Sequence, residues 1–86
     1  MTIEFDKGKS EKTRKECGFG FEIAERFEAV SIIEDERKDY GEPRFRAWGF
    51  IDGEAYALVF TPRNGKMRII SLRRMHKKEM KENDLK

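Results

Sequence analysis

Six arginines within one short stretch of the sequence give its strongest chemical signal. A guanidinium presents a planar fork of donors that binds phosphate through two hydrogen bonds, and it stays charged when partly buried. If the stretch folds as one unit, several of these cations come within reach of one another. Two interpretations remain open: a phosphate-binding surface, or ion pairs with carboxylates such as Glu42 and Glu79. The six are Arg44, Arg46, Arg63, Arg68, Arg73 and Arg74.

The charges are unevenly distributed along the chain. The 86 residues carry a formal net charge of +2, with 19 Lys and Arg against 17 Asp and Glu. Residues 63–86 hold nine Lys and Arg but three Asp and Glu, so they carry +6 and the rest carries −4. A basic segment on an otherwise acidic domain favours a polyanionic partner, RNA or DNA first. The alternative is a solvated charged helix.

Other kinds of site have less support. One histidine, His76, and one cysteine, Cys17, cannot supply a zinc site, and no internal disulfide can form. The acidic run around Glu34 lacks the spacing of a calcium loop, and Gly18 and Gly20 do not follow a strand as phosphate-binding glycines do. We expect no metal and no cofactor. No apolar run reaches the ~20 residues that span a bilayer, so we expect a cytoplasmic protein without membrane contact.

Hydrophobic patterning predicts that residues 44–74 form a three-stranded antiparallel meander. Strands are expected at 45–51, 55–60 and 67–74, with turns at 52–53 and 62–65. The run 55–60 is apolar throughout, which is typical of a strand covered on both faces, and Pro62 is expected to stop strand pairing. Trp48 and Tyr56 could stack on bases, but packing in the core is the preferred interpretation for both.

The remaining segments are predicted to surround this meander. Residues 2–5 alternate like a short strand, and a polar helix over 7–16 is expected to start after Asp6 and to end at Gly18. Further elements are expected as a short helix over 21–28 with an apolar stripe, a strand at 30–33, an exposed loop over 34–41 and a basic helix over 75–83. The predicted fold is one α+β domain over residues 1–86: an antiparallel sheet, two N-terminal helices packed on it and a C-terminal helix.

Several motifs together resemble the BrnT toxin family. The resemblance covers nearly the whole chain, and its most specific part is the closing block from Arg68 onward. The motifs are Phe5-Asp6-x-x-Lys9, Gly18-x-x-Phe21, Gly41-Glu42-x-Arg44-Phe45 with Gly49, Thr61-x-Arg63, and Arg68-Ile69-Ile70-Ser71-x-Arg73-Arg74 followed by Glu79. The chain departs from the family pattern at Cys17, Leu72, His76 and Asn83.

The resemblance implies a fold, an activity and a partner. The fold would be RelE-like, and the activity that of a metal-independent ribonuclease that arrests translation as the toxin of a type II toxin–antitoxin pair. The partner would be a BrnA-type antitoxin, which neutralises the toxin in a hetero-oligomer. Operator DNA would be contacted only through that antitoxin.

RNA cleavage without a metal ion needs cations around the reacting phosphate. The 2′-hydroxyl attacks the adjacent phosphate in line, and preorganised charges stabilise the transition state. We hypothesise that Arg68 and Arg73 hold the scissile phosphate and that Arg63 and Lys9 support them. Glu42 is the candidate base.

The roles of two further residues and two further function classes stay open. Glu79 is an alternative base, whereas His76, a single histidine on a basic helix, is expected to be a surface residue. One other class is a non-catalytic or attenuated module that binds nucleic acid and antitoxin with the same basic face. The other is a protein-interaction domain whose arginines bind an acidic partner segment.

Overall fold

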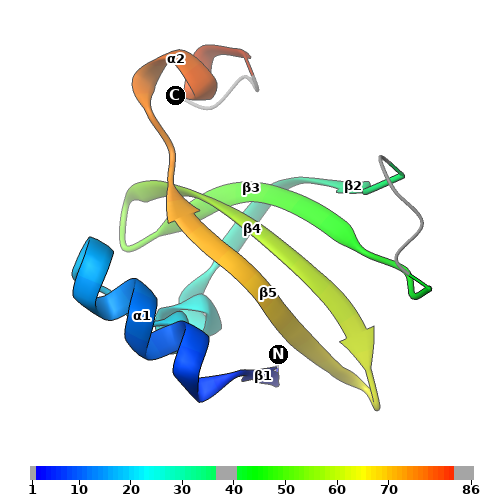
Figure 1. The fold of residues 1–86 in the computed structure, drawn as a ribbon. Coiled ribbons are helices and arrows are strands. Elements are labelled where there is room, and N and C mark those ends of the chain that lie inside the picture. Colours follow the sequence, from blue (N-terminus) through cyan, green and yellow to red (C-terminus); the bar gives the residue numbers. More distant parts are fainter. Residues whose placement is uncertain (1, 37–40, 83–86) are drawn as a thin grey trace.

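A five-stranded sheet forms the centre of the computed structural model, which describes residues 2–36 and 41–82 (Figure 1). The strands are β1 (Ile3–Phe5), β2 (Glu28–Glu34), β3 (Phe45–Ile51), β4 (Glu54–Arg63) and β5 (Lys66–Arg74). The helices are α1 (Lys7–Cys17), the 3-10 helix η1 (Phe21–Arg26) and α2 (Lys77–Glu82). The α+β class, the N-terminal helix, the C-terminal meander and the C-terminal helix are confirmed. None of the described helices is long and apolar enough to cross a membrane.

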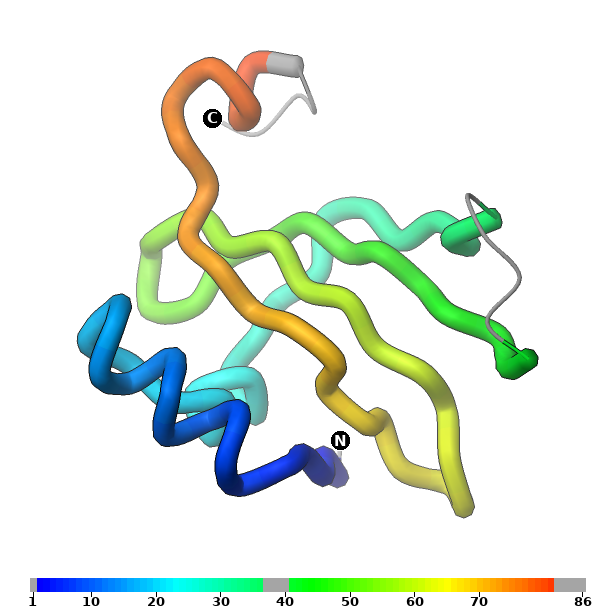
Figure 2. The backbone as a smooth tube through the Cα atoms, in the orientation of Figure 1, coloured from blue at the N-terminus to red at the C-terminus, as the bar shows by residue number. Residues whose placement is uncertain are grey.

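The sheet is mixed, so the prediction of an antiparallel sheet was wrong for one strand. The strand order is β1-β5-β4-β3-β2, and β1 runs parallel to β5 while all other neighbours are antiparallel. Figure 2 shows the N-terminal segment beside the last strand of the meander. The pairing sets Ile3 opposite Met67 and Phe5 opposite Ile69, so the short strand joins its apolar side chains to those of β5.

The meander follows the predicted strands and turns closely. Asp52 and Gly53 have φ of 50° and 83°, and Asn64 and Gly65 have φ of 52° and 75°. Positive φ at both central residues is the conformation of a two-residue hairpin turn that matches the twist of the strands. Pro62, however, does not stop pairing, because β4 continues to Arg63. β4 leaves β3 after Phe60, so the missing N–H of the proline interrupts no ladder on that side.

The main core lies between one face of the sheet and η1. A short helix was predicted over residues 21–28, and the structure has the 3-10 helix η1, which ends at Arg26. A 3-10 helix has three residues per turn, so Phe21 and Ala24, both buried, project on the same side. The other buried members of this core are Ala47, Ile51, Tyr56, Leu58, Phe60, Ile69 and Leu72.

The polar helix α1 packs mainly against η1, so the prediction that both N-terminal helices pack on the sheet was wrong for α1. The Asp6 side chain accepts a hydrogen bond from the backbone N–H of Lys9, and Gly18 closes the helix with φ of 85°, as predicted. Ser10 is buried, and its hydroxyl oxygen accepts a hydrogen bond of 2.9 Å from the backbone N–H of Phe21. This bond joins the polar helix α1 to η1, the helix that carries the apolar stripe.

The bounds of β2 and α2 differ from the predicted ones. β2 is longer than predicted, contains a bulge between Ala29 and Ser31, and leaves three apolar side chains of an edge strand exposed: Val30, Ile32 and Ile33. α2 begins at Lys77, later than predicted, and Met80 packs against the cluster of Met75 and Ala55. Residues 37–40 of the predicted loop and residue 83 of the predicted helix lie outside the described residues.

Candidate functional site

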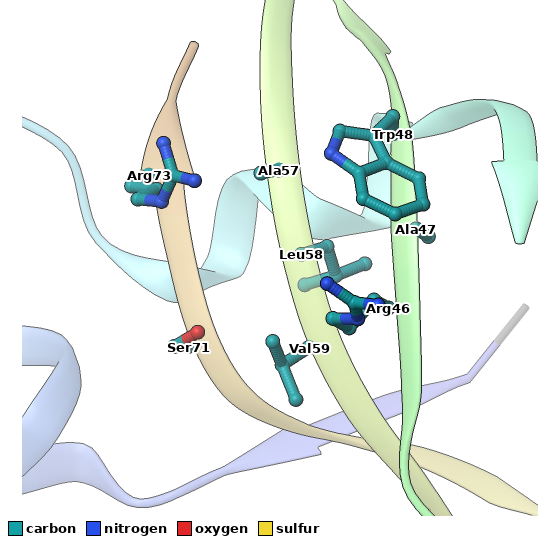
Figure 3. A pocket seen from close by; sticks show the side chains of 8 residues that line it. All are labelled: Arg46, Ala47, Trp48, Ala57, Leu58, Val59, Ser71 and Arg73. Carbon is teal, nitrogen blue, oxygen red and sulfur yellow. The ribbon is translucent and has the colours of Figure 1, made fainter. Parts of the chain in front are cut away.

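The face of the meander opposite η1 carries an open hollow of about 240 Å³ (Figure 3). The prediction that residues 55–60 are covered on both faces was therefore wrong for this side. Tyr56, Leu58 and Phe60 are buried, whereas Ala57 and Val59 are only half-buried. The hollow is lined by Arg46, Ala47 and Trp48 of β3, Ala57, Leu58 and Val59 of β4, and Ser71 and Arg73 of β5.

Strand register explains why the hollow forms. Residues directly opposite on neighbouring strands project from the same face of a sheet. Two rows result, one of Arg46, Val59 and Ser71 and the other of Trp48, Ala57 and Arg73. In the second row the small Ala57 lies between Trp48 and Arg73, and in the first row Val59 and Ser71 are both short beside Arg46. The surface of the sheet is consequently lowest along β4, with a guanidinium on each side: Arg46 on β3 and Arg73 on β5.

Arg73 holds a carboxylate of the C-terminal helix. Its two terminal nitrogens donate hydrogen bonds of 2.8 and 2.7 Å to the two carboxylate oxygens of Glu79. Hydrogen bonds from Arg73, followed by one from the backbone N–H of His76, lower the pKa of Glu79 to about 2. The same hydrogen bonds raise the pKa of Arg73 above its ordinary value. Arg73 is thus a permanent cation whose fork is occupied by an anion from its own chain.

Arg46 stands in a different environment on the other side of the hollow. Its guanidinium carbon lies 5.5 Å from the centroid of the Trp48 ring. Its Nε is buried and donates to no acceptor among the described residues. A buried polar group without a partner is uncommon in folded proteins. Arg46 is therefore the guanidinium of the hollow that has no carboxylate of the described chain in its fork.

The other strand arginine predicted for the site, Arg68, lies further along the same face. It is opposite Thr61 on β4 and Glu4 on β1, and it forms an ion pair of 3.6 Å with Glu4. Arg68 and Arg73 are five residues apart on one strand, which separates their Cα atoms by about 16 Å. This separation favours contacts of the two arginines with two different phosphates rather than with a single phosphate. Each arginine also forms an ion pair with a carboxylate.

The remaining predicted site residues lie around the edges of the molecule. Arg63 is exposed at the end of β4, beside the second turn, and Lys9 is exposed on α1, which is attached to η1 on the other side of the sheet. Glu42 is exposed before β3 and forms an ion pair of 3.7 Å with Arg44. The structure thus brings Arg73 into the hollow, sets Arg68 on the same face, and leaves Lys9, Glu42 and Arg63 apart from the hollow lining.

Ion pairs occur among the residues that were predicted to form the site. Glu42 and Glu79 pair with arginines, as the ion-pair interpretation expected. The hypothesis for the catalytic site did not include Arg46, Trp48 or Ser71, although Arg46 was one of the six candidate arginines and base stacking was the less preferred interpretation of Trp48. The signal for the first two was alternation: positions 46 and 48 share a face of a strand, and their neighbours on the opposite face are small or apolar. Within residues 2–36 and 41–82, no group of three or more His, Cys, Asp and Glu could hold a metal ion.

Comparisons with known proteins identify the family. The family model described as "Ribonuclease toxin, BrnT, of type II toxin-antitoxin system" matches residues 5–79. The match begins at Phe5, the last residue of β1, extends over β2 to β5 and ends at Glu79, the residue that Arg73 binds. No curated protein and no solved structure matches the chain. With its sheet, its hollow of arginines and nearly all of its length within the match, the chain belongs to the BrnT family of ribonuclease toxins of type II toxin–antitoxin systems.

Proposed function

We propose that this protein is a metal-independent endoribonuclease that cleaves RNA to arrest translation. The observation that carries the proposal is the hollow on the open face of the meander, where Arg46 and Arg73 flank an apolar floor and the Ser71 hydroxyl. Fixed cations at a partly dehydrated site stabilise the charge that develops on a phosphate during transfer. Guanidinium groups supply this charge without a metal ion.

The reaction is an in-line displacement at phosphorus. The 2′-oxygen forms a bond to the adjacent phosphorus as the bond from phosphorus to the 5′-oxygen breaks. The products are a 2′,3′-cyclic phosphate and a free 5′-hydroxyl. One proton leaves the 2′-hydroxyl for a base, and one reaches the departing 5′-oxygen. Arg73 binds the non-bridging oxygens of the scissile phosphate, and Arg68 binds a neighbouring phosphate on the same face.

Glu42 is our choice of base, and Arg63 and Lys9 serve as outer contacts to the RNA backbone. Glu79 is less suited to accept a proton, because the hydrogen bonds from Arg73 hold its pKa at about 2. Glu42 instead meets a guanidinium at 3.7 Å, without the two-point fork that ties Glu79 to Arg73.

The proposed physiological setting is a toxin–antitoxin complex in the cytoplasm. A toxin of a type II system is paired with a protein antitoxin. We infer that this antitoxin is of the BrnA type, that it neutralises the toxin in a hetero-oligomer, and that operator DNA is bound only through the antitoxin. The support is the family match over residues 5–79.

Induced expression in a bacterial host tests the activity. Arg73→Gln is compared with Arg74→Gln, because both arginines pair with a carboxylate but Arg74 pairs with Glu54 outside the hollow. We expect wild type and Arg74→Gln to stop growth and to create new RNA 5′ ends. Arg73→Gln should lose on the order of 10²-fold in cleavage rate. Cleavage by the purified protein should persist in excess EDTA.

Controls on this test separate the site from the activity. An Arg68→Ala and Arg73→Ala double variant that folds and still cuts at the wild-type rate would remove the arginines from the mechanism and leave the activity intact. Activity that disappears in EDTA and returns with a divalent ion would overturn the metal-independent route.

The occupied fork of Arg73 favours a second candidate function. With Glu79 bound, two of the five N–H donors of Arg73 are engaged and its charge is balanced by a carboxylate, as an attenuated toxin or a non-catalytic binding module would show. This alternative predicts RNA binding that weakens steeply with salt, no new RNA ends and no growth arrest from a folded wild-type protein.

A further inference from the structure

We propose that Trp48 is a stacking platform for one unpaired RNA base and that Arg46 binds the phosphate beside that base. The substrate would then enter the hollow as a single strand. This inference rests on the proposed function, since it takes RNA as the ligand. It gives defined roles to Trp48, for which core packing was the preferred interpretation, and to Arg46, which was one of six candidate arginines.

The placement of Trp48 separates it from the other aromatic candidate. Tyr56 is buried in the main core, where its ring lies edge-on to Phe19 with 5.3 Å between the ring centroids. Trp48 projects from the opposite face and lines the hollow beside the small side chain of Ala57 (Figure 3). An indole ring next to an open hollow can stack with any base, because every base has a π-face.

Trp48 is also held in position by its neighbours. It packs against the small cluster of Ala55 and Met75, and the guanidinium of Arg46 lies against its ring. A cation over an indole is attracted by the negative ring face, so the pair fixes both side chains relative to each other. A fixed aromatic ring loses little conformational entropy when a base stacks on it.

Arg46 supplies the second element of the site. Other strand arginines of this face, Arg68 and Arg73, each meet a carboxylate. Arg46 has its Nε buried with no acceptor among the described residues, and no described carboxylate compensates for its loss of water. A phosphate anion in the hollow would provide that compensation through charge-assisted hydrogen bonds. The Ser71 hydroxyl, across Val59 in the same row, lines the same hollow.

The geometry selects single strands over duplexes. In a duplex every base is stacked between its neighbours, and the major groove of A-form RNA is too narrow for side chains to reach the bases. A base can stack on Trp48 only if it leaves such a stack. Arg46 can contact a phosphate of either a single strand or a duplex, so the preference for single strands comes from Trp48.

Intrinsic fluorescence gives a direct test, because Trp48 is the single tryptophan of the chain. The probe is a 2′-O-methyl oligoribonucleotide, which lacks the attacking hydroxyl and stays uncut. We expect quenching of Trp48 by this single strand, and much weaker quenching by the same strand annealed to its complement. Inorganic phosphate at equal charge should leave the fluorescence nearly unchanged.

Variants separate stacking from charge, with affinities measured by the anisotropy of a labelled oligonucleotide. Trp48→Ala should weaken binding on the order of tenfold, with no change in the dependence of affinity on salt. Trp48→Phe keeps packing in place and should retain most of the affinity. Arg46→Gln should reduce the slope of log affinity against log salt by about 0.7, the value for one phosphate contact on a single strand. Arg26→Gln, which removes an arginine paired with Asp52 outside the hollow, should not alter the slope in this way.

Each result bears on either the inference or the proposed function. Wild-type protein that cuts RNA without any change in Trp48 fluorescence, and with normal binding by Trp48→Ala, would overturn the inference and leave the nuclease standing. Equal quenching by duplex and single strand would also overturn it. Quenching by the single strand without cleavage of unmodified RNA would support the stacking site and contradict the nuclease. Quenching by an antitoxin but not by RNA would assign the hollow to protein binding and overturn the inference.

Discussion

Arg73 and Glu79 connect the last strand of the sheet to the C-terminal helix through two parallel hydrogen bonds of 2.8 and 2.7 Å. The same carboxylate accepts a bond of 3.2 Å from the backbone N–H of His76, which directly precedes α2. Glu79 therefore has two roles, since it caps the start of its own helix and fills the fork of a guanidinium that lines the hollow. The side chain of Glu79 therefore couples the position of α2 to the availability of Arg73 for a phosphate.

Replacing Glu79 tests whether it competes with phosphate. Glu79→Gln keeps the shape of the side chain and removes its charge, so Arg73 should bind RNA more readily. We expect oligonucleotide affinity to rise about two- to fivefold, consistent with the ~0.2–1 kcal/mol of an exposed ion pair. Glu54→Gln is the matched control, because it frees Arg74 outside the hollow. An equal rise in both variants would show that only net charge matters.

The lowered pKa of Glu79 predicts how stability depends on pH. The pKa is about 2 in the folded protein against an ordinary value of 4.5. The stabilising contribution is therefore fully present above pH 4.5, and it is lost as the pH falls from 4.5 toward 2. Urea unfolding of wild type and Glu79→Gln should show a difference in unfolding free energy that is constant above pH 4.5 and shrinks below it. A difference that grows at low pH would contradict this prediction.

Ser10 should contribute more to stability than its place on a polar helix suggests. Ser10→Ala leaves the buried backbone N–H of Phe21 without its acceptor, which costs about 1–3 kcal/mol. The measurement is the urea midpoint, and Ser71→Ala is the matched control because Ser71 is exposed. We expect less than about 0.5 kcal/mol for the control, as for most surface substitutions. Equal effects would mean that the bond between α1 and η1 contributes little.

Gly49 should tolerate no side chain. A Cβ at this position would lie 2.1 Å from the carbonyl oxygen of Glu28, where β2 begins its pairing with β3. Relieving such an overlap requires a backbone shift, so Gly49→Ala should lower the free energy of unfolding by about 1–3 kcal/mol or more. Gly8→Ala on exposed α1 is the control and should change stability by no more than about 1 kcal/mol. Thermal melts followed by circular dichroism would distinguish the two.

Local signals in the sequence determined the meander and the first helix. The Asp52-Gly53 and Asn64-Gly65 pairs form the turns that their tolerance of positive φ predicts. Asp6 and Gly18 bound α1 because capping depends on residues within one turn of the chain. The family resemblance carried by residues from Phe5 to Glu79 was confirmed over the same span. These features depend on interactions between residues that are close in sequence.

Contacts between distant segments decided the rest. The parallel pairing of β1 with β5, the 3-10 geometry of η1 and the continuation of β4 through Pro62 each depend on a neighbour that the local sequence does not specify. The same holds for the hollow. Arginine content predicted cations for phosphate, but the register of three strands decided which guanidinium groups share a space and which meet a carboxylate. By itself the sequence determined the chemistry that is present, and the tertiary structure decided where that chemistry is concentrated, because a change of one residue in register moves every side chain of a strand to the other face.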